Sequence, residues 1–85
     1  MAGTVRVLLF ASAREAVGRS RLDRPVPPGG VSVEALLAGL TEEFPRLTPI
    51  LRGARFVRNG RYLPDRTGRL DPEDEFAIHP PFSGG

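Results

Sequence analysis

Apolar and β-branched residues near the start of the chain predict a central strand over residues 4–10. Because successive side chains of a strand point to opposite faces, odd-numbered positions share one face and even-numbered positions share the other. If a helix covers the odd-numbered face, Leu8 and Phe10 remain on the uncovered face. Each of the two alone fits ordinary strand packing, but together they indicate a docking patch.

An amphipathic helix is predicted from apolar residues at helical spacing, namely Val33, Leu36, Leu37, Leu40 and Phe44. Ser32 is a suitable cap for the amino terminus of this helix, and Pro45 ends it. Such a stripe packs into a core rather than around a ligand. We therefore expect the helix to cover one face of a sheet.

The second half of the chain predicts a hairpin and a final strand. Residues 55–58 and 61–63 flank Asn59-Gly60, a pair that tolerates positive φ and is the strongest short-range hairpin signal. Residues 64–69 form a polar loop, and a turn then leads into a last strand that closes over residues 76–78.

Three further segments have weaker patterns. Residues 20–26 alternate loosely and meet prolines, which indicates an edge strand. Residues 11–18 contain helix formers but are few and end in glycine, so a structured loop or a single turn is expected. Residues 47–51 include a proline and indicate a turn or a short 3₁₀ segment.

The predicted order is strand, strand, helix, strand, strand, strand. One apolar sheet face must be buried against one apolar helix stripe. This favours an α+β fold of the β-grasp, ubiquitin-like type, in which a mixed sheet of about five strands clasps one main helix and the last strand lies beside the first. We expect a single domain over residues 1–85, with a flexible carboxyl-terminal tail over residues 80–85.

Composition restricts the possible chemistry. The chain has 85 residues, 40% of them hydrophobic and 26% charged, which fits an ordinary globular domain. With no cysteine and one histidine, it offers neither a disulfide nor a thiol nucleophile, and no bound metal is expected. No apolar stretch is long enough for a membrane span, and the apolar run after Arg6 is too short for a signal peptide. We expect a cytoplasmic protein.

The basic residues are all arginine, and the chain contains no lysine. Twelve arginines are scattered among ten acidic residues, so the net charge is only +2 and no nucleic-acid-binding motif is formed. Without lysine, the chain cannot accept an isopeptide bond on a side chain. Nucleic acid is therefore not an expected partner, and covalent chemistry belongs to the chain ends or to hydroxyl groups.

The last residues form the candidate site. Two prolines follow His79 and remove two backbone donors, so strand pairing must stop there. The chain then ends in Ser-Gly-Gly, a narrow stalk that carries a carboxylate. Residues 80–85 would reach about 20 Å when fully extended. This shape suits insertion into a partner's active site, although small residues at a chain end are also typical of simple fraying.

Several motifs match one known family in order along nearly the whole chain. They are Val7-Leu8-Leu9-Phe10-Ala11, Arg14-Glu15 with Gly18, Ser32-Val33-Glu34-Ala35-Leu36, Val57-Arg58-Asn59-Gly60 and residues 74–85. In these motifs the chain resembles the small subunit of molybdopterin synthase, the ubiquitin-like sulfur carrier of molybdenum cofactor synthesis. The most specific are the terminal Pro-Pro-x-x-Gly-Gly and the Phe-Ala-x-x-Arg-Glu block.

The resemblance implies a substrate-like carrier that is not catalytic alone and binds no cofactor itself. An E1-like adenylyltransferase would activate the Gly85 carboxylate with ATP and magnesium, and a sulfur donor protein would convert it to a thiocarboxylate. Gly84 would let the backbone pass through a slot in the large molybdopterin synthase subunit. There the tail would give its sulfur to cyclic pyranopterin monophosphate. A heterotetramer is implied, with two small subunits at the ends of a large-subunit dimer.

The resemblance also implies which residues contact partners: Leu8, Phe10, Arg14, His79, Pro80, Pro81, Phe82 and Ser83. Arg14 either pairs with a partner or is simply solvated. Many relatives carry an aromatic or aliphatic residue in place of His79, so this histidine weakens a purely apolar patch and could make docking mildly pH-sensitive. A partly exposed strand-end histidine without a special task is the simpler interpretation.

Two alternatives remain open at the level of sequence. A carrier of the same fold and Gly-Gly end could serve another pathway, such as thiazole formation for thiamin or cysteine synthesis. The chain length and the Pro-Pro-Phe-Ser-Gly-Gly end favour molybdopterin. The other alternative is a β-grasp binding module with an inert tail.

Overall fold

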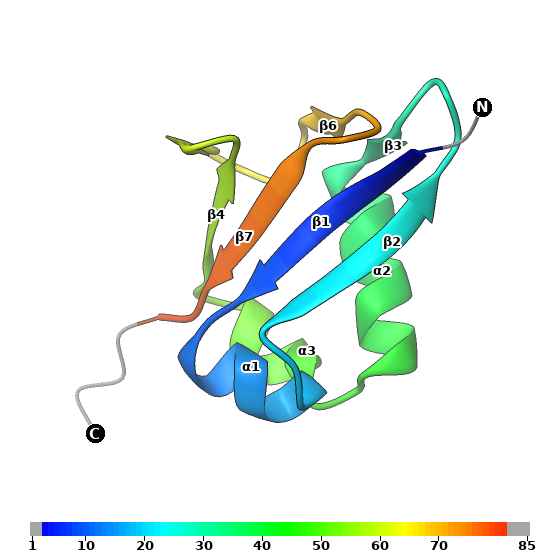
Figure 1. Ribbon diagram of the computed structural model, residues 1–85. Coiled ribbons are helices and arrows are strands. Elements are labelled where there is room, and N and C mark those ends of the chain that lie inside the picture. Colours follow the sequence, from blue (N-terminus) through cyan, green and yellow to red (C-terminus); the bar gives the residue numbers. More distant parts are fainter. Residues whose placement is uncertain (1–2, 82–85) are drawn as a thin grey trace.

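The computed structural model describes residues 3–81, in which five strands form a mixed sheet in the order β2-β1-β7-β4-β5 (Figure 1). The strands are β1 (Gly3–Leu9), β2 (Arg21–Val26), β4 (Arg55–Arg58), β5 (Arg61–Tyr62) and β7 (Glu75–His79). β1 and β7 pair in parallel, whereas the other neighbours pair antiparallel. The expected β-grasp arrangement is confirmed, with the last strand at the centre of the sheet beside the first.

Helix α2 (Val33–Glu43) lies across one face of the sheet, as its apolar stripe predicted (Figure 1). The Ser32 hydroxyl accepts a hydrogen bond of 3.0 Å from the Ala35 N–H and caps the helix. Four stripe residues are buried, namely Val33, Leu36, Leu37 and Leu40. They meet the odd-numbered side chains of β1, of which Val5 and Val7 are fully buried. The opposite face of the sheet carries the even-numbered positions of β1, as expected.

Helix α1 (Ala11–Val17) corrects the expectation of a loop or single turn. Its only fully buried residue is Ala13, with Ala16 and Val17 partly buried against the core, so the sequence carries only a short stripe of small apolar side chains to reveal it. The helix ends at Gly18, which has a left-handed φ of 85° and donates its N–H to the Arg14 carbonyl at 2.7 Å. Packing of Ala13 into the core and this glycine cap explain why a short segment forms a complete helix.

Helix α3 (Leu47–Leu51) was expected as a turn or 3₁₀ segment and is a short α-helix. Pro49 lies in its first turn, where the missing N–H costs no intrahelical hydrogen bond. Leu47 and Leu51 are buried in the core. No helix within residues 3–81 is long and apolar enough to cross a membrane.

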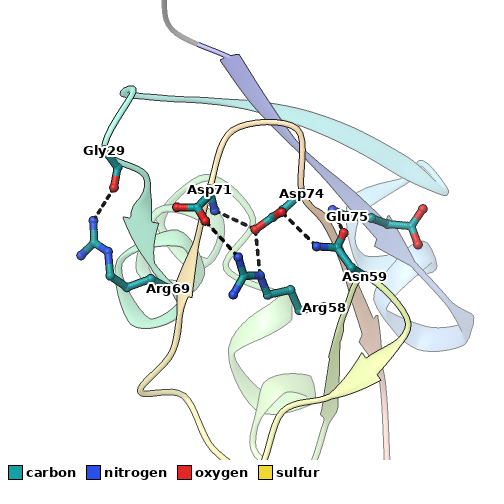
Figure 2. A network of polar contacts seen from close by, with 7 residues as sticks. All are labelled: Gly29, Arg58, Asn59, Arg69, Asp71, Asp74 and Glu75. Atoms are coloured by element: carbon teal, nitrogen blue, oxygen red, sulfur yellow. Dashed lines mark hydrogen bonds and ion pairs between the residues drawn. The ribbon is translucent and has the colours of Figure 1, made fainter.

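Two short strands were missed in sequence. β3 (Val31–Ser32) pairs antiparallel with β6 (Arg69–Leu70) in a small second sheet. The Arg69 side chain donates to the Gly29 carbonyl at 2.8 Å (Figure 2), and Leu70 is fully buried. Two-residue strands have no readable alternation, so their pairing depends on contacts made only in the folded chain.

Candidate functional site

A row of apolar side chains crosses the sheet face that α2 leaves uncovered. Leu8 pairs with Ala77, Ala77 pairs with Val57, and Val57 pairs with Tyr62, so these four neighbours share one face. Ala77 is buried beneath its neighbours, whereas Tyr62 is 68% exposed at the edge. We call these four residues the apolar row. Leu8 therefore lies where the sequence predicted, and Val57 and Tyr62 extend the predicted patch across the sheet.

An aromatic pair lies beside the apolar row, at the end of the sheet from which the tail leaves. The rings of Phe10 and His79 stack with centroids 4.5 Å apart and an angle of 9° between their planes. Phe10 remains 43% exposed, so one side of the pair is open to a partner. Arg55 lies opposite His79 on β4. The imidazole thus covers part of the Phe10 ring and continues the flat surface, rather than interrupting it.

Charged residues form the opposite border of the apolar row. Arg6 approaches Glu75 at 3.9 Å, and Arg21 contacts Asp23 at 3.1 Å. All four side chains are at least two-fifths exposed, so the pairs contribute little stability. Their arrangement instead limits the apolar surface on one side.

The root of the tail is held against the turn between α3 and β4. His79 is the last paired residue of β7, which confirms that pairing stops there. Pro80 is half-buried and Pro81 is exposed, without regular secondary structure. A Cβ atom at Gly53 would lie 3.2 Å from the Pro81 Cβ, so the turn passes directly against the proline. Phe82, Ser83, Gly84 and Gly85, which include the predicted reactive end, lie outside the described residues.

Arg14 is exposed on α1, which lies at the same end of the sheet as the tail root (Figure 1). Its carbonyl accepts the capping hydrogen bond of Gly18. Within residues 3–81 its guanidinium makes no ion pair. Its predicted role in docking therefore stays a prediction.

A polar network fixes the β4–β5 hairpin to the start of β7 (Figure 2). The Asp74 carboxylate accepts hydrogen bonds from Arg58 Nε at 2.8 Å, from Asn59 Nδ2 at 2.9 Å and from the Asp71 N–H at 2.7 Å. The Asn59 side-chain carbonyl in turn accepts the Glu75 N–H at 2.9 Å. The hairpin that carries Tyr62 is thereby tied to the strand that carries the tail.

The same network sets the ionisation of Asp74. Partial burial alone would raise the pKa of this carboxyl, but hydrogen bonds from Asn59, the Asp71 N–H and Arg58, with the charge of Arg58, lower the pKa below its ordinary value. The sequence signal for the network was the Asn-Gly turn followed by two aspartates three residues apart. The contact between Asn59 and Asp74, which are fifteen residues apart, could not be predicted from that spacing.

The model of the ThiS family matches residues 7–85 of the chain. The chain belongs to the ThiS family. Relatives support the resemblance seen in sequence. The molybdopterin synthase sulfur carrier subunit of Aedes aegypti is 38% identical over 95% of this chain and 88% of its own length. The subunit of the same name from Arabidopsis thaliana is 36% identical over 95% of this chain and 82% of its own length.

Solved structures agree with the fold of this ThiS-family chain. The small archaeal modifier protein 1 of Methanosarcina acetivorans has a TM-score of 0.80 and 28% identity, covering 100% of this chain and 99% of its own. The Haloferax volcanii protein of the same name has a TM-score of 0.81 and 25% identity, covering 98% and 100%. The ubiquitin-like fold of residues 3–81 is therefore shared with these solved structures.

The described part of this ThiS-family chain presents surfaces suited to docking. Within residues 3–81 no polar or charged side chain is buried, and no three potential metal-ligating side chains cluster. What the geometry provides is an apolar row, an aromatic pair and a fixed tail root at one end of the sheet. A carboxylate beyond that root would leave the domain beside a surface that a partner protein could cover.

Proposed function

We propose that this chain is the sulfur carrier subunit of a molybdopterin synthase. The observation that carries the proposal is the match of nearly the whole chain to relatives of that name, at up to 38% identity. The central position of β7, which leads directly to the tail, supports it. A strand paired on both sides gives the tail a rigid base.

The proposed chemistry takes place at the carboxylate of Gly85. A carboxylate is a poor electrophile, so an E1-like adenylyltransferase uses ATP and magnesium to give it an AMP leaving group. The outer sulfur of a donor protein's persulfide displaces AMP, and a thiol reductant then cleaves the S–S bond to the donor. This releases a thiocarboxylate, whose sulfur is a nucleophile on a tether. In the large subunit this sulfur attacks a carbon of cyclic pyranopterin monophosphate with loss of an oxygen substituent, and hydrolysis of the resulting thioester leaves the sulfur on the pterin and restores the Gly85 carboxylate. Tethering raises the local concentration of the sulfur, and Gly84 removes side-chain bulk from the path.

In this proposal the partners dock on the uncovered sheet face. Leu8, Phe10, Tyr62 and His79 supply an apolar and aromatic surface of the kind enriched in interface cores. Pro80, Pro81, Phe82 and Ser83 lead from that surface to the reactive end. The proposal includes a heterotetramer with a large-subunit dimer and a cytoplasmic location, where thiol-based sulfur donors stay reduced.

The test is to weigh the intact protein after incubation with an E1-like partner, ATP, magnesium and a sulfur donor. Loading should add about 16 Da, because one sulfur replaces one oxygen of the carboxylate. The loaded chain should then convert cyclic pyranopterin monophosphate in the presence of the large subunit. An unchanged mass under conditions that load a known carrier would refute the proposal. A chain lacking Gly85 is the control and should gain no sulfur.

A protein modifier is a second candidate, favoured by the likeness to two small archaeal modifier proteins at 25–28% identity. In that role the activated Gly85 carboxyl would form an amide with a lysine of a target protein. Conjugates on denaturing gels, dependent on ATP and on Gly85, would support it.

A loaded chain that serves thiazole or cysteine synthesis, and leaves the pterin unchanged, would instead identify a carrier of another pathway.

A further inference from the structure

A cavity of about 380 Å³ lies between the α3–β4 turn and the β4–β5 hairpin. Three arginines line it, Arg52, Arg55 and Arg66, together with Tyr62 and one acidic residue, Asp65. The cavity lies at the free edge of the sheet, next to the apolar row. None of these three arginines takes part in the proposed sulfur transfer.

The charges around this cavity are unbalanced. Within residues 3–81, no carboxylate lies within ion-pair distance of Arg52, Arg55 or Arg66, although four other arginines of the chain do form such pairs. The single carboxylate in the lining, Asp65, accepts hydrogen bonds from the backbone and hydroxyl of Thr67 instead. Three arginines therefore line the cavity with little compensating negative charge, which favours an anionic occupant.

One of the three guanidinium groups is held in place. Arg66 donates a hydrogen bond to the Leu51 carbonyl at 2.5 Å, and its guanidinium carbon lies 5.4 Å from the centre of the Phe56 ring. A guanidinium has five N–H donors, so these contacts leave capacity for a ligand. Arg52 and Arg55 are exposed and can adjust around it. The fixed position of Arg66 lowers the entropy lost on binding, whereas ordering Arg52 and Arg55 adds to that cost.

The cavity adjoins the root of the tail. Arg52 precedes Gly53, which contacts Pro81, and Arg55 lies opposite His79 in the sheet. A protein that encloses the tail up to its root therefore comes to lie over Arg52 and Arg55. Its surface there must supply negative charge or leave these charges uncompensated under the interface.

We propose that this arginine cavity binds an acidic segment of the protein that receives the tail. Aspartate or glutamate side chains would accept paired hydrogen bonds from the guanidinium groups, and Tyr62 would pack against the apolar part of the same segment. The inference rests on the proposed function, because it takes the tail-receiving protein to be the large molybdopterin synthase subunit. It adds to that function an electrostatic contact that orients the partner around the tail.

The test uses the full chain and the large molybdopterin synthase subunit of the same organism, with affinity measured by calorimetry at low and at high salt. Arg52→Glu and Arg55→Glu together should weaken binding about tenfold or more at low salt and reduce the salt dependence. Each single variant, Arg52→Glu or Arg55→Glu, should weaken binding in part. Arg46→Glu is the matched control for these single variants, because it makes the same charge change at the other end of α3. It should bind like the wild type. Thermal unfolding of each variant checks that the fold is intact.

The outcomes separate the inference from the proposed function. A folded double variant that binds the large subunit like the wild type, with the same salt dependence, overturns the inference about the arginine cavity. The carrier role is tested separately, and a mass gain of the wild type on loading upholds it. Failure of the wild type to bind the large subunit also overturns the inference. Inorganic phosphate that shifts the NMR signals of Arg52 and Arg55 without weakening the binding of the large subunit would assign the cavity to a free anion. That result would also contradict an acidic segment as the occupant.

Discussion

Asp74 is the residue whose polar contacts most directly connect the hairpin to the tail strand. Its side chain is only 13% exposed and accepts hydrogen bonds from two side chains and one backbone N–H. A charged acceptor with several donors is worth more than an exposed ion pair. The stability of this end of the sheet therefore depends on one ionised carboxylate.

Replacing Asp74 by asparagine should lower the free energy of unfolding at neutral pH by about 1–2 kcal/mol. Because the folded-state pKa lies below the ordinary 3.8, ionised Asp74 stabilises the fold above that value, and this stabilisation is lost as the pH falls through the folded-state pKa. Urea unfolding should thus show a difference in the free energy of unfolding between wild type and variant at pH 7, and this difference should become smaller in strong acid. Asp71→Asn is the control. Its more exposed carboxylate predicts a smaller effect.

Tyr62 shows how a single exposed ring can be assigned to a docking surface. It is the most exposed member of the apolar row, and its ring has no task in the core. Tyr62→Ala should weaken binding of the large subunit about tenfold or more, as truncation of an interface aromatic commonly does, without lowering the unfolding temperature. Tyr62→Phe keeps the ring and should bind nearly as the wild type. Equal affinity of all three proteins would exclude Tyr62 from the interface.

At the scale of elements, the parts foreseen from sequence were those with a local pattern. The apolar stripe of α2 and the Asn59-Gly60 turn each specify their structure within a few residues. α1 was missed because Ala13 alone is fully buried, and β3 and β6 because each spans two residues. In the candidate site, too, the residues that could be predicted were those in a local sequence pattern. Leu8 and Phe10 lie in one readable apolar run, expected as a strand over residues 4–10, although β1 ends at Leu9 and Phe10 is the N-cap of α1. The roles of Tyr62 and Arg55 depend on register between strands.

The glycine that ends α1 allows a direct test of this element. Gly18 has a φ of 85°, a conformation that costs an L-residue about 1 kcal/mol, and it has open space around the position of a Cβ atom. Gly18→Ala should therefore lower the free energy of unfolding by about 1 kcal/mol through backbone strain alone. Gly29→Ala is the matched control, since Gly29 has equally open space without a positive φ. It should change stability little. A denaturant titration compares the two.

At the scale of the whole molecule, the apolar row and the aromatic pair lie on the uncovered face of the sheet, and the arginine cavity lies at its adjoining edge. The tail leaves from β7, the central strand, which pairs with β1 and β4 (Figure 1). The apolar row, the aromatic pair and the arginine cavity all adjoin this strand or its neighbours. A partner that covers them would therefore fix both the position of the domain and the direction of its tail.

That direction depends on the contact between Gly53 and Pro81, so Gly53→Ala should affect transfer more than stability. The added Cβ would lie 3.2 Å from the Pro81 Cβ, closer than ordinary packing, and the exposed proline must shift to accommodate it. A small shift at the root moves the reactive end further, and misplacement of about 1 Å can slow a reaction up to 100-fold. We expect an unchanged unfolding temperature, normal loading with sulfur, and slower single-turnover transfer to the pterin in the large subunit. Transfer at the wild-type rate would mean that the partner alone sets the course of the tail.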